Sequence, residues 1–143
     1  MFDYSCGWGN RLLAALCNKL DYTGVDTNPV LVEKLRECAA DFNMVNNLNL
    51  KVDIRNQGSE IFNPEWVEQF GLCFSSPPYF DLELYNGEQT STEKFKTYED
   101  WLEGYLRPTI VNCSKYLVPG GNFIMSIKNM GRKKMYDSAF KMC

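Results

Sequence analysis

Residues 3–10 read Asp3-Tyr4-Ser5-Cys6-Gly7-Trp8-Gly9-Asn10, and a helical pattern over residues 11–20 follows directly. The two glycines let the backbone turn sharply and come close to a ligand. The helix start offers free amide donors and the positive end of a helix dipole to a carboxylate or another anion. The third glycine of the G-x-G-x-x-G dinucleotide fingerprint is missing, so a simple tight turn is the competing interpretation.

The next informative residue is Asp26, at the end of a strand-like run over residues 22–26. An acid at the end of such a strand can accept hydrogen bonds from both hydroxyls of a ribose. Its alternative role is to cap the helix that opens at Pro29. Together with the glycine loop, Asp26 favours a nucleoside-containing cofactor.

A third stretch, Ser75-Ser76-Pro77-Pro78-Tyr79, follows a strand expected over residues 71–75. Its two prolines fix the backbone dihedrals and remove two amide donors. What remains is a rigid row of carbonyl acceptors between a serine oxygen and an aromatic face. That arrangement suits a planar ring with an amino group, although a proline-rich turn with a core tyrosine has the same sequence.

Strand-like and helix-like periodicity alternate along the whole chain. Further strands are expected over residues 48–52 and 122–127, and further helices from Pro29 and from Thr97, the second bent near Pro108. This alternation predicts an α/β fold with a mainly parallel sheet, whose ligands bind at the carboxyl ends of the strands. We expect residues 1–143 to form a single domain. The aperiodic segment from Phe80 to Lys96 is expected to close over a substrate.

Composition excludes several kinds of chemistry. The chain contains no histidine, which excludes Ser-His triads and zinc hydrolysis with histidine ligands. Its six cysteines are scattered without a C-x-x-C pair, so we expect no metal site and no disulfide framework, but free thiols in the cytoplasm. No apolar run is long enough to span a membrane. The net charge of −3 offers little general attraction for nucleic acids.

The three stretches, in this order, resemble the motifs of S-adenosylmethionine-dependent DNA amino-methyltransferases: Asp3-x-x-x-Gly7-x-Gly9, Asp26 and Ser76-Pro77-Pro78-Tyr79. The resemblance implies a Rossmann-like class I methyltransferase sheet and S-adenosylmethionine as cofactor. It implies methyl transfer to the exocyclic amine of adenine or cytosine in DNA, on a base flipped out of the duplex. The family's sheet has seven strands, so we expect a methyltransferase core that is incomplete at both ends.

The resemblance also implies a role for each motif residue. The methionine part and the nucleoside of the cofactor would be held by Asp3, Ser5, Cys6, Gly7, Gly9, Asp26, Thr27, Asp53 and Ile54. Among these, Asp53 would follow the third strand and accept from the adenine amino group, while Ile54 would pack on the ring. The catalytic segment would be Ser76, Pro77, Pro78 and Tyr79. There the tyrosine would stack on the base, and the Ser76 hydroxyl and Pro77 carbonyl would accept the two amino hydrogens.

Two alternatives stay open at this point. Related Pro-Pro-aromatic loops also serve amino-methyltransferases that act on RNA bases or on protein glutamine. A catalytically silent methyltransferase-like binding module is the other alternative. The sequence leaves open which base is modified and what the oligomeric state is. A DNA substrate would fit a restriction–modification role.

Overall fold

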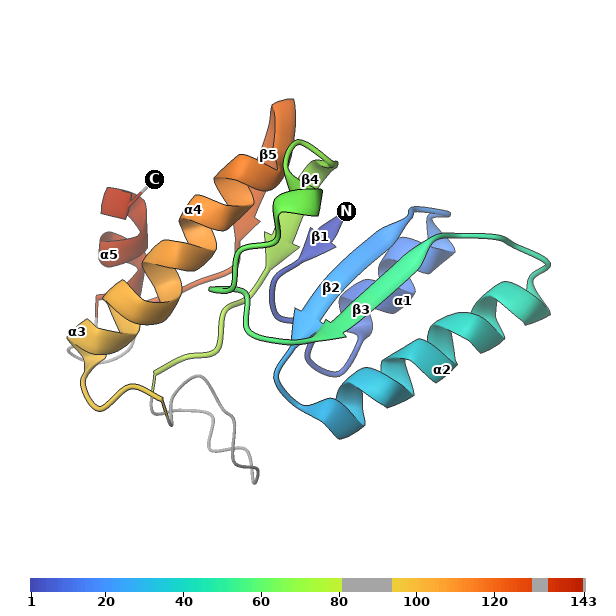
Figure 1. The fold of residues 1–143 in the computed structure, drawn as a ribbon, viewed down its shortest axis with the longest axis horizontal. Helices are drawn as coiled ribbons and strands as arrows, with labels where there is room; N and C mark the ends of the chain where they lie inside the picture. The colour runs from blue at the N-terminus through green and yellow to red at the C-terminus, as the bar shows by residue number, and fades with distance from the viewer. Residues whose placement is uncertain (81–93, 130–133, 143) are drawn as a thin grey trace.

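The computed structural model describes residues 1–80, 94–129 and 134–142. Its centre is a five-stranded parallel sheet in the order β3-β2-β1-β4-β5 (Figure 1). The strands are β1 (Phe2–Asp3), β2 (Tyr22–Asp26), β3 (Val52–Asn56), β4 (Phe70–Ser75) and β5 (Leu117–Met125). The strand order reverses between β1 and β4. In open α/β sheets such a switch point leaves a crevice at the carboxyl ends, where ligands bind.

Helices cover both faces of the sheet (Figure 1). The helical elements are α1 (Asn10–Cys17), α2 (Pro29–Val45), η1 (Pro64–Trp66), α3 (Tyr98–Trp101), the π-helical η2 (Leu102–Leu106), α4 (Arg107–Tyr116) and α5 (Met135–Met142). On one face, α1 and α2 bury Leu12, Leu16 and Leu35 against Tyr22 and Ile54 of the sheet. On the other face, α4 packs Cys113 and Tyr116 against Phe2, Val25 and Cys73. The predicted α/β fold with a parallel sheet is therefore confirmed.

The central strand β1 consists of only two residues. Phe2 and Asp3 pair with Thr23 and Gly24 of β2, and Phe2 also pairs with Cys73 of β4. Both β1 side chains are fully buried. The short strand therefore joins the two halves of the sheet and places Asp3 at the switch point.

The third strand lies four residues later than the sequence predicts. We expected a strand over residues 48–52, whereas β3 runs from Val52 to Asn56. The reason is Asn43 of α2, whose amide side chain bonds both the N–H and the C=O of Leu50, at 3.2 and 3.0 Å. Because these backbone groups are satisfied by a side chain, Leu50 contributes apolar packing without joining the ladder.

Near Pro108, where the sequence predicts a bend, the structure has a change of helix type. Proline cannot donate the backbone hydrogen bond of a regular α-helix, and Pro108 stands in the first turn of α4. Directly before α4, the backbone is π-helical over Leu102–Leu106. Short π-helical stretches inside helices are frequent at functional sites.

Candidate functional site

The motif residues converge on the carboxyl edge of the sheet at the switch point. Asp3 ends β1, Asp26 ends β2, and Ser76 follows the last residue of β4. The sequence predicted this placement for these three residues. Asp53, the fourth residue expected at this edge, lies elsewhere, as described below.

The glycine loop is shaped by two left-handed residues. Gly7 has φ +53° and Gly9 has φ +82°, a region that side-chain-bearing residues rarely adopt. A Cβ at Gly9 would lie 2.4 Å from Leu35 Cδ2, so the loop is pressed against α2. A Cβ at Gly7 would meet no atom within 4 Å, so there is open space beside this residue. Gly9 also forms the N-cap of α1, whose first amides face the loop.

We predict that Gly9→Ala lowers the free energy of unfolding by about 2–4 kcal/mol, through left-handed strain and the clash with Leu35. Urea denaturation measures this change. Gly71→Ala is the matched control, because Gly71 is exposed and a Cβ there would meet no atom within 4 Å. Equal effects of the two substitutions would contradict the prediction.

Asp3 holds the glycine loop from beneath. Its carboxylate is fully buried and accepts from the Ser5 N–H at 3.2 Å, from Arg11 Nε at 2.8 Å and from the Tyr22 hydroxyl at 2.8 Å. Burial raises the pKa of Tyr22, and the negative charge of the Asp3 carboxylate raises it further. The phenol therefore stays protonated and donates to Asp3. Arg11 also donates to the Ser5 carbonyl. Both carboxylate oxygens of Asp3 are thus engaged, and the residue positions the loop.

Asp26 connects the glycine loop to the start of α2. Its Oδ2 accepts from the Gly7 N–H at 2.9 Å and its Oδ1 from the Asn28 N–H at 3.0 Å. Each carboxylate oxygen has a second lone pair, so Asp26 retains acceptor capacity. The Asp26 backbone carbonyl accepts from Asn56 Nδ2 and from the Gln57 N–H, at 3.0 and 3.1 Å. The carboxyl end of β3 therefore lies directly beside Asp26.

Gln57 is the first residue after β3, which is the position that the sequence analysis assigned to Asp53. Its Nε2 is buried and has no hydrogen-bond partner in the part of the chain that the structure describes. Glu60, three residues on, has a buried Oε2 that also lacks a partner there, while its Oε1 pairs with Lys94 at 3.3 Å. Sequence reasoning missed both residues because it ended the third strand four residues early.

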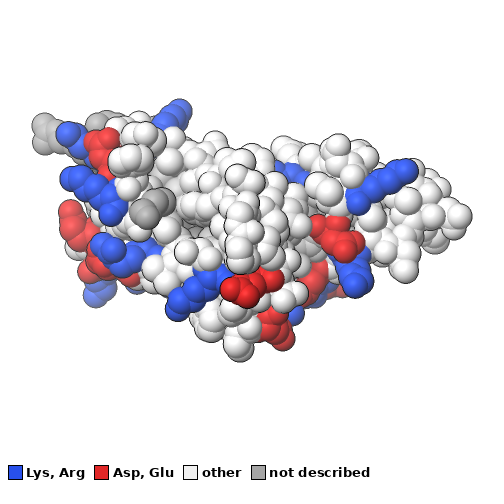
Figure 2. Space-filling model, turned by 90° about the horizontal axis from the view of Figure 1, so that it is seen from above, with Lys and Arg blue, Asp and Glu red and all other residues white. Residues whose placement is uncertain are grey.

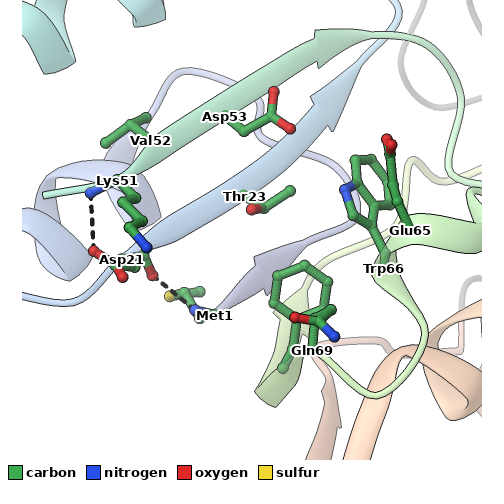
Figure 3. A pocket seen from close by; sticks show the side chains of 10 residues that line it. Met1, Asp21, Thr23, Lys51, Val52, Asp53, Glu65, Trp66 and Gln69 are labelled. Atoms are coloured by element: carbon green, nitrogen blue, oxygen red, sulfur yellow. Dashed lines mark hydrogen bonds between the residues drawn. The ribbon is translucent and has the colours of Figure 1, made fainter.

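Asp53 and Ile54 do not lie at the carboxyl edge. Asp53 pairs with Thr23, three residues before the Asn56–Asp26 pair, or about 10 Å further back along the strand. It lines a hollow of about 490 Å³ with Thr23, Glu65 and Trp66 (Figure 3), and its carboxylate accepts from Arg55 at 2.6 Å. Ile54 is 2% exposed in the core between the sheet and α1–α2, so its side chain is not available to a ring. The adenine contacts expected of both residues are not supported by these positions.

The other loop residues differ in accessibility. Cys6 is buried; its backbone N–H donates to the Val25 carbonyl at 2.9 Å, and burial raises the pKa of its thiol. Ser5 and Thr27 are half-buried. Trp8 stands between the two glycines with its side chain 78% exposed. The loop therefore offers a ligand its backbone and its open surface, not the Cys6 sulfur.

Hydrogen bonds fix the start of the Ser-Pro-Pro-Tyr segment through Ser75, the residue before it, and through Ser126, the residue after β5. Ser75 is fully buried, donates from Oγ to the Ser5 carbonyl at 3.1 Å, and accepts at its own carbonyl from the Tyr4 hydroxyl at 2.9 Å. Ser76 donates from Oγ to the Ser126 carbonyl at 2.9 Å. That bond uses the only hydroxyl proton of Ser76 and leaves the oxygen's lone pairs as acceptors. The sequence did not show that Ser75 and Tyr4 tie the two motifs together.

Tyr79 has partly the environment of a core residue. It is half-buried, and with Phe80 it packs against a cluster that includes Trp101, Tyr105 and Leu106. The segment expected to close over a substrate, from Phe80 to Lys96, lies mostly outside the described residues.

The described residues, 1–80, 94–129 and 134–142, contain neither a cluster of metal ligands nor a membrane-spanning helix. Within these ranges no three Cys, Asp or Glu side chains come together as a metal site requires. No helix in the same ranges combines the length and the apolar character needed to cross a membrane.

Solved structures resemble this arrangement of strands and helices. A geranyl diphosphate methyltransferase in complex with GPP and sinefungin matches with a TM-score of 0.59 and 14% identity, over 87% of this chain and 37% of its own. The [4+2]-cyclase SpnF matches with a TM-score of 0.57 and 18% identity, over 99% of this chain and 48% of its own. An S-adenosylmethionine-dependent methyltransferase from Clostridium acetobutylicum ATCC 824 matches with a TM-score of 0.50 and 22% identity, over 90% of this chain and 42% of its own. No protein-family model and no curated protein sequence matches.

These likenesses show the fold, which is the Rossmann-like sheet of class I methyltransferases. The chain spans less than half the length of each of the three structures. The cyclase among them carries a similar fold with a different named reaction, so the fold alone does not define an activity.

Proposed function

We propose that this chain binds S-adenosylmethionine and transfers its methyl group to the exocyclic amine of adenine or cytosine in DNA. The observation that carries the proposal is the contact of two motifs at the switch point. Ser75, the last residue of β4 and the one directly before the Ser-Pro-Pro-Tyr segment, donates from Oγ to the Ser5 carbonyl of the glycine loop. An amine held by the second motif would therefore lie close to a donor held by the first.

The residues around Asp26 suit the nucleoside part of the cofactor. Asp26 retains acceptor capacity for ribose hydroxyls, and Gly7 has open space beside it. In the loop after β3, Gln57 supplies an unpartnered donor and Glu60 an unpartnered acceptor, counted over the described residues. Adenine carries ring-nitrogen acceptors and an amino donor, which complement this pair. We therefore assign the adenine contacts to Gln57 and Glu60 instead of Asp53 and Ile54.

The Ser-Pro-Pro-Tyr segment suits the substrate amine. When bound, S-adenosylmethionine supplies an electrophilic methyl group on a cationic sulfur. The Ser76 oxygen and the Pro77 carbonyl accept the two amino hydrogens, which draws the nitrogen lone pair out of the ring. Tyr79 stacks on the base and orients it for in-line attack. Attack of this nitrogen on the methyl carbon would displace the sulfur as a neutral thioether and leave the nitrogen cationic, and the nitrogen would then lose a proton to solvent. None of these steps requires histidine.

The DNA would approach at the carboxyl edge. The face in Figure 2 mixes acidic and basic side chains without a continuous basic area, so we do not assign the nucleic acid to that face. At the carboxyl edge, positioning by Tyr79, Ser76 and Pro77 would contribute more than general charge attraction. A flipped base would meet these groups directly.

We predict that Asp26→Ala weakens S-adenosylmethionine binding by about 1–3 kcal/mol, because charged hydrogen bonds to the ribose are lost. Calorimetry on the full-length protein measures the affinity. Asp53→Ala is the control, and we expect it to leave the affinity unchanged because Asp53 lies in the hollow of Figure 3. A loss with Asp53→Ala equal to that with Asp26→Ala would restore the original assignment.

Radiolabelled methyl transfer to duplex DNA, RNA and protein, compared in one assay, tests the substrate. Transfer to adenine or cytosine of DNA supports the proposal. If methyl transfer occurs only to RNA or only to protein glutamine, that molecule is the substrate class and DNA is not. Cofactor binding without transfer to any of the three favours a silent binding module.

A further inference from the structure

Three aromatic rings follow one another along α3 and η2, the first pair stacked and the second tilted. The rings of Tyr98 and Trp101 are 6.0 Å apart at 17°, and those of Trp101 and Tyr105 are 5.6 Å apart at 34°. We call these three residues the aromatic ladder. The π-helical stretch Leu102–Leu106 begins immediately after Trp101 and contains Tyr105, so the ladder spans the change of helix type.

Two polar groups of the ladder have no hydrogen-bond partner among the residues that the structure describes. Trp101 is 0% exposed, yet neither its Nε1 nor the buried hydroxyl of Tyr98 makes a hydrogen bond within the described residues. Leaving a buried donor unpaired costs about 1–3 kcal/mol. By contrast, the Tyr105 hydroxyl bonds Ser59 Oγ at 3.4 Å. Apolar packing alone would be served better by phenylalanine at position 98, so the two donors point to a ligand that offers acceptors.

The ladder belongs to the substrate side of the site. Tyr79 and Phe80, which directly follow the two prolines, pack against the cluster that contains Trp101. The Phe80 ring lies 5.9 Å from the Tyr98 ring in an edge-on orientation and 6.4 Å from the Trp101 ring in a tilted one. A flat ring held by Tyr79 would reach the ladder by taking the place of the Phe80 ring.

Resting on the proposed function, we propose that Trp101 Nε1 and the Tyr98 hydroxyl select the substrate base by donating to its Watson–Crick edge. The Ser76 oxygen and the Pro77 carbonyl accept from the amino group, and Trp101 Nε1 donates to the single lone pair of the ring nitrogen beside it. Adenine N1 and cytosine N3 are acceptors at that position. Guanine N1 carries a hydrogen there, so guanine would set a donor against a donor and be rejected.

The test removes the acceptor from the base. Fluorescence anisotropy measures binding of single-stranded oligonucleotides to the full-length protein with sinefungin present. Each oligonucleotide contains one adenine, one 1-deazaadenine, one cytosine or one 3-deazacytosine as its only amino-bearing target. We expect the natural protein to bind at least one deaza base about tenfold more weakly than its parent. In Trp101→Phe, which lacks the N–H, that difference should fall below twofold.

Tyr98→Phe supplies a second and gentler variant. Because it removes an unpaired buried hydroxyl, its melting temperature should stay equal or rise, while its affinity for the natural base falls. Tyr105→Phe is the control: it loses the bond to Ser59, so its melting temperature should fall while its discrimination against the deaza base remains. If the ladder were purely structural, Tyr98→Phe would not weaken base binding without a loss of melting temperature, and Tyr105→Phe would not show the reverse.

Two outcomes would overturn the inference. If the oligonucleotides bind and each deaza base binds as tightly as its parent, the ladder does not read the base, while the proposed function stands. If the natural protein binds no oligonucleotide at all, the proposed function fails and the inference fails with it.

Discussion

Tyr79→Ala is expected to reduce methyl transfer to DNA by about 10- to 100-fold, the value of one lost base-stacking contact. Cofactor affinity should change much less. Tyr79 follows the rigid prolines on the substrate side, whereas the cofactor contacts are assigned to the glycine loop, Asp26 and Gln57. Radiolabelled transfer and calorimetry on the same full-length variant measure the two effects separately.

The half-buried position of Tyr79 makes its controls important. Tyr79→Phe keeps the ring and should lose little activity, because stacking does not need the hydroxyl. Tyr136→Ala removes an aromatic ring that is 52% exposed on α5, and it should leave transfer unchanged. If Tyr79→Ala lowers the melting temperature and cofactor affinity together with transfer, Tyr79 is a core residue. Normal transfer in a folded Tyr79→Ala protein would refute its catalytic role.

Asp3→Ala is expected to lower the free energy of unfolding by about 3–5 kcal/mol, because it leaves the partly buried Arg11 guanidinium without its counter-charge. It also removes the acceptor of the Tyr22 hydroxyl and of the Ser5 N–H. Urea denaturation measures this loss, and cofactor binding should fail with it because the loop loses its support.

The control for Asp3 is an ion pair on the surface. Lys34 and Glu37 of α2 are joined at 2.6 Å, with side chains 68% and 53% exposed. Solvent screens such pairs, so Glu37→Ala should leave the urea midpoint close to that of the natural protein. If Asp3→Ala were as mild as Glu37→Ala, the buried network beneath the glycine loop would not be supporting the fold.

Local sequence signals predicted the parts of the site that depend on neighbouring residues. The strand at Tyr22–Asp26 and the helix start at Pro29 were predicted at their observed positions, because alternation and an N-terminal proline act within a few residues. The motif residues Asp3, Asp26 and Ser76 lie at strand ends, as predicted. Their roles toward cofactor and base stay predictions.

The missed features all depend on contacts between residues far apart in the sequence or on side-chain partners. Asn43 satisfies the backbone N–H and C=O of Leu50, so β3 begins later in the sequence than predicted. For this reason the proposed adenine contact changes from Asp53 to Gln57. The bond from Ser75 to Ser5 spans 70 residues. Hydrophobic periodicity contains no information about such bonds, nor about which buried donors stay unpaired.

The exposed position of Trp8 gives the protein a built-in optical reporter. The chain has three tryptophans, and the other two, Trp66 and Trp101, are 5% and 0% exposed. The emission of Trp8 should therefore lie at longer wavelength, and a water-soluble quencher should reach Trp8 before the other two. Because Trp8 stands between Gly7 and Gly9, any molecule that settles on this loop should alter the long-wavelength part of the spectrum, so that occupancy can be followed without a label.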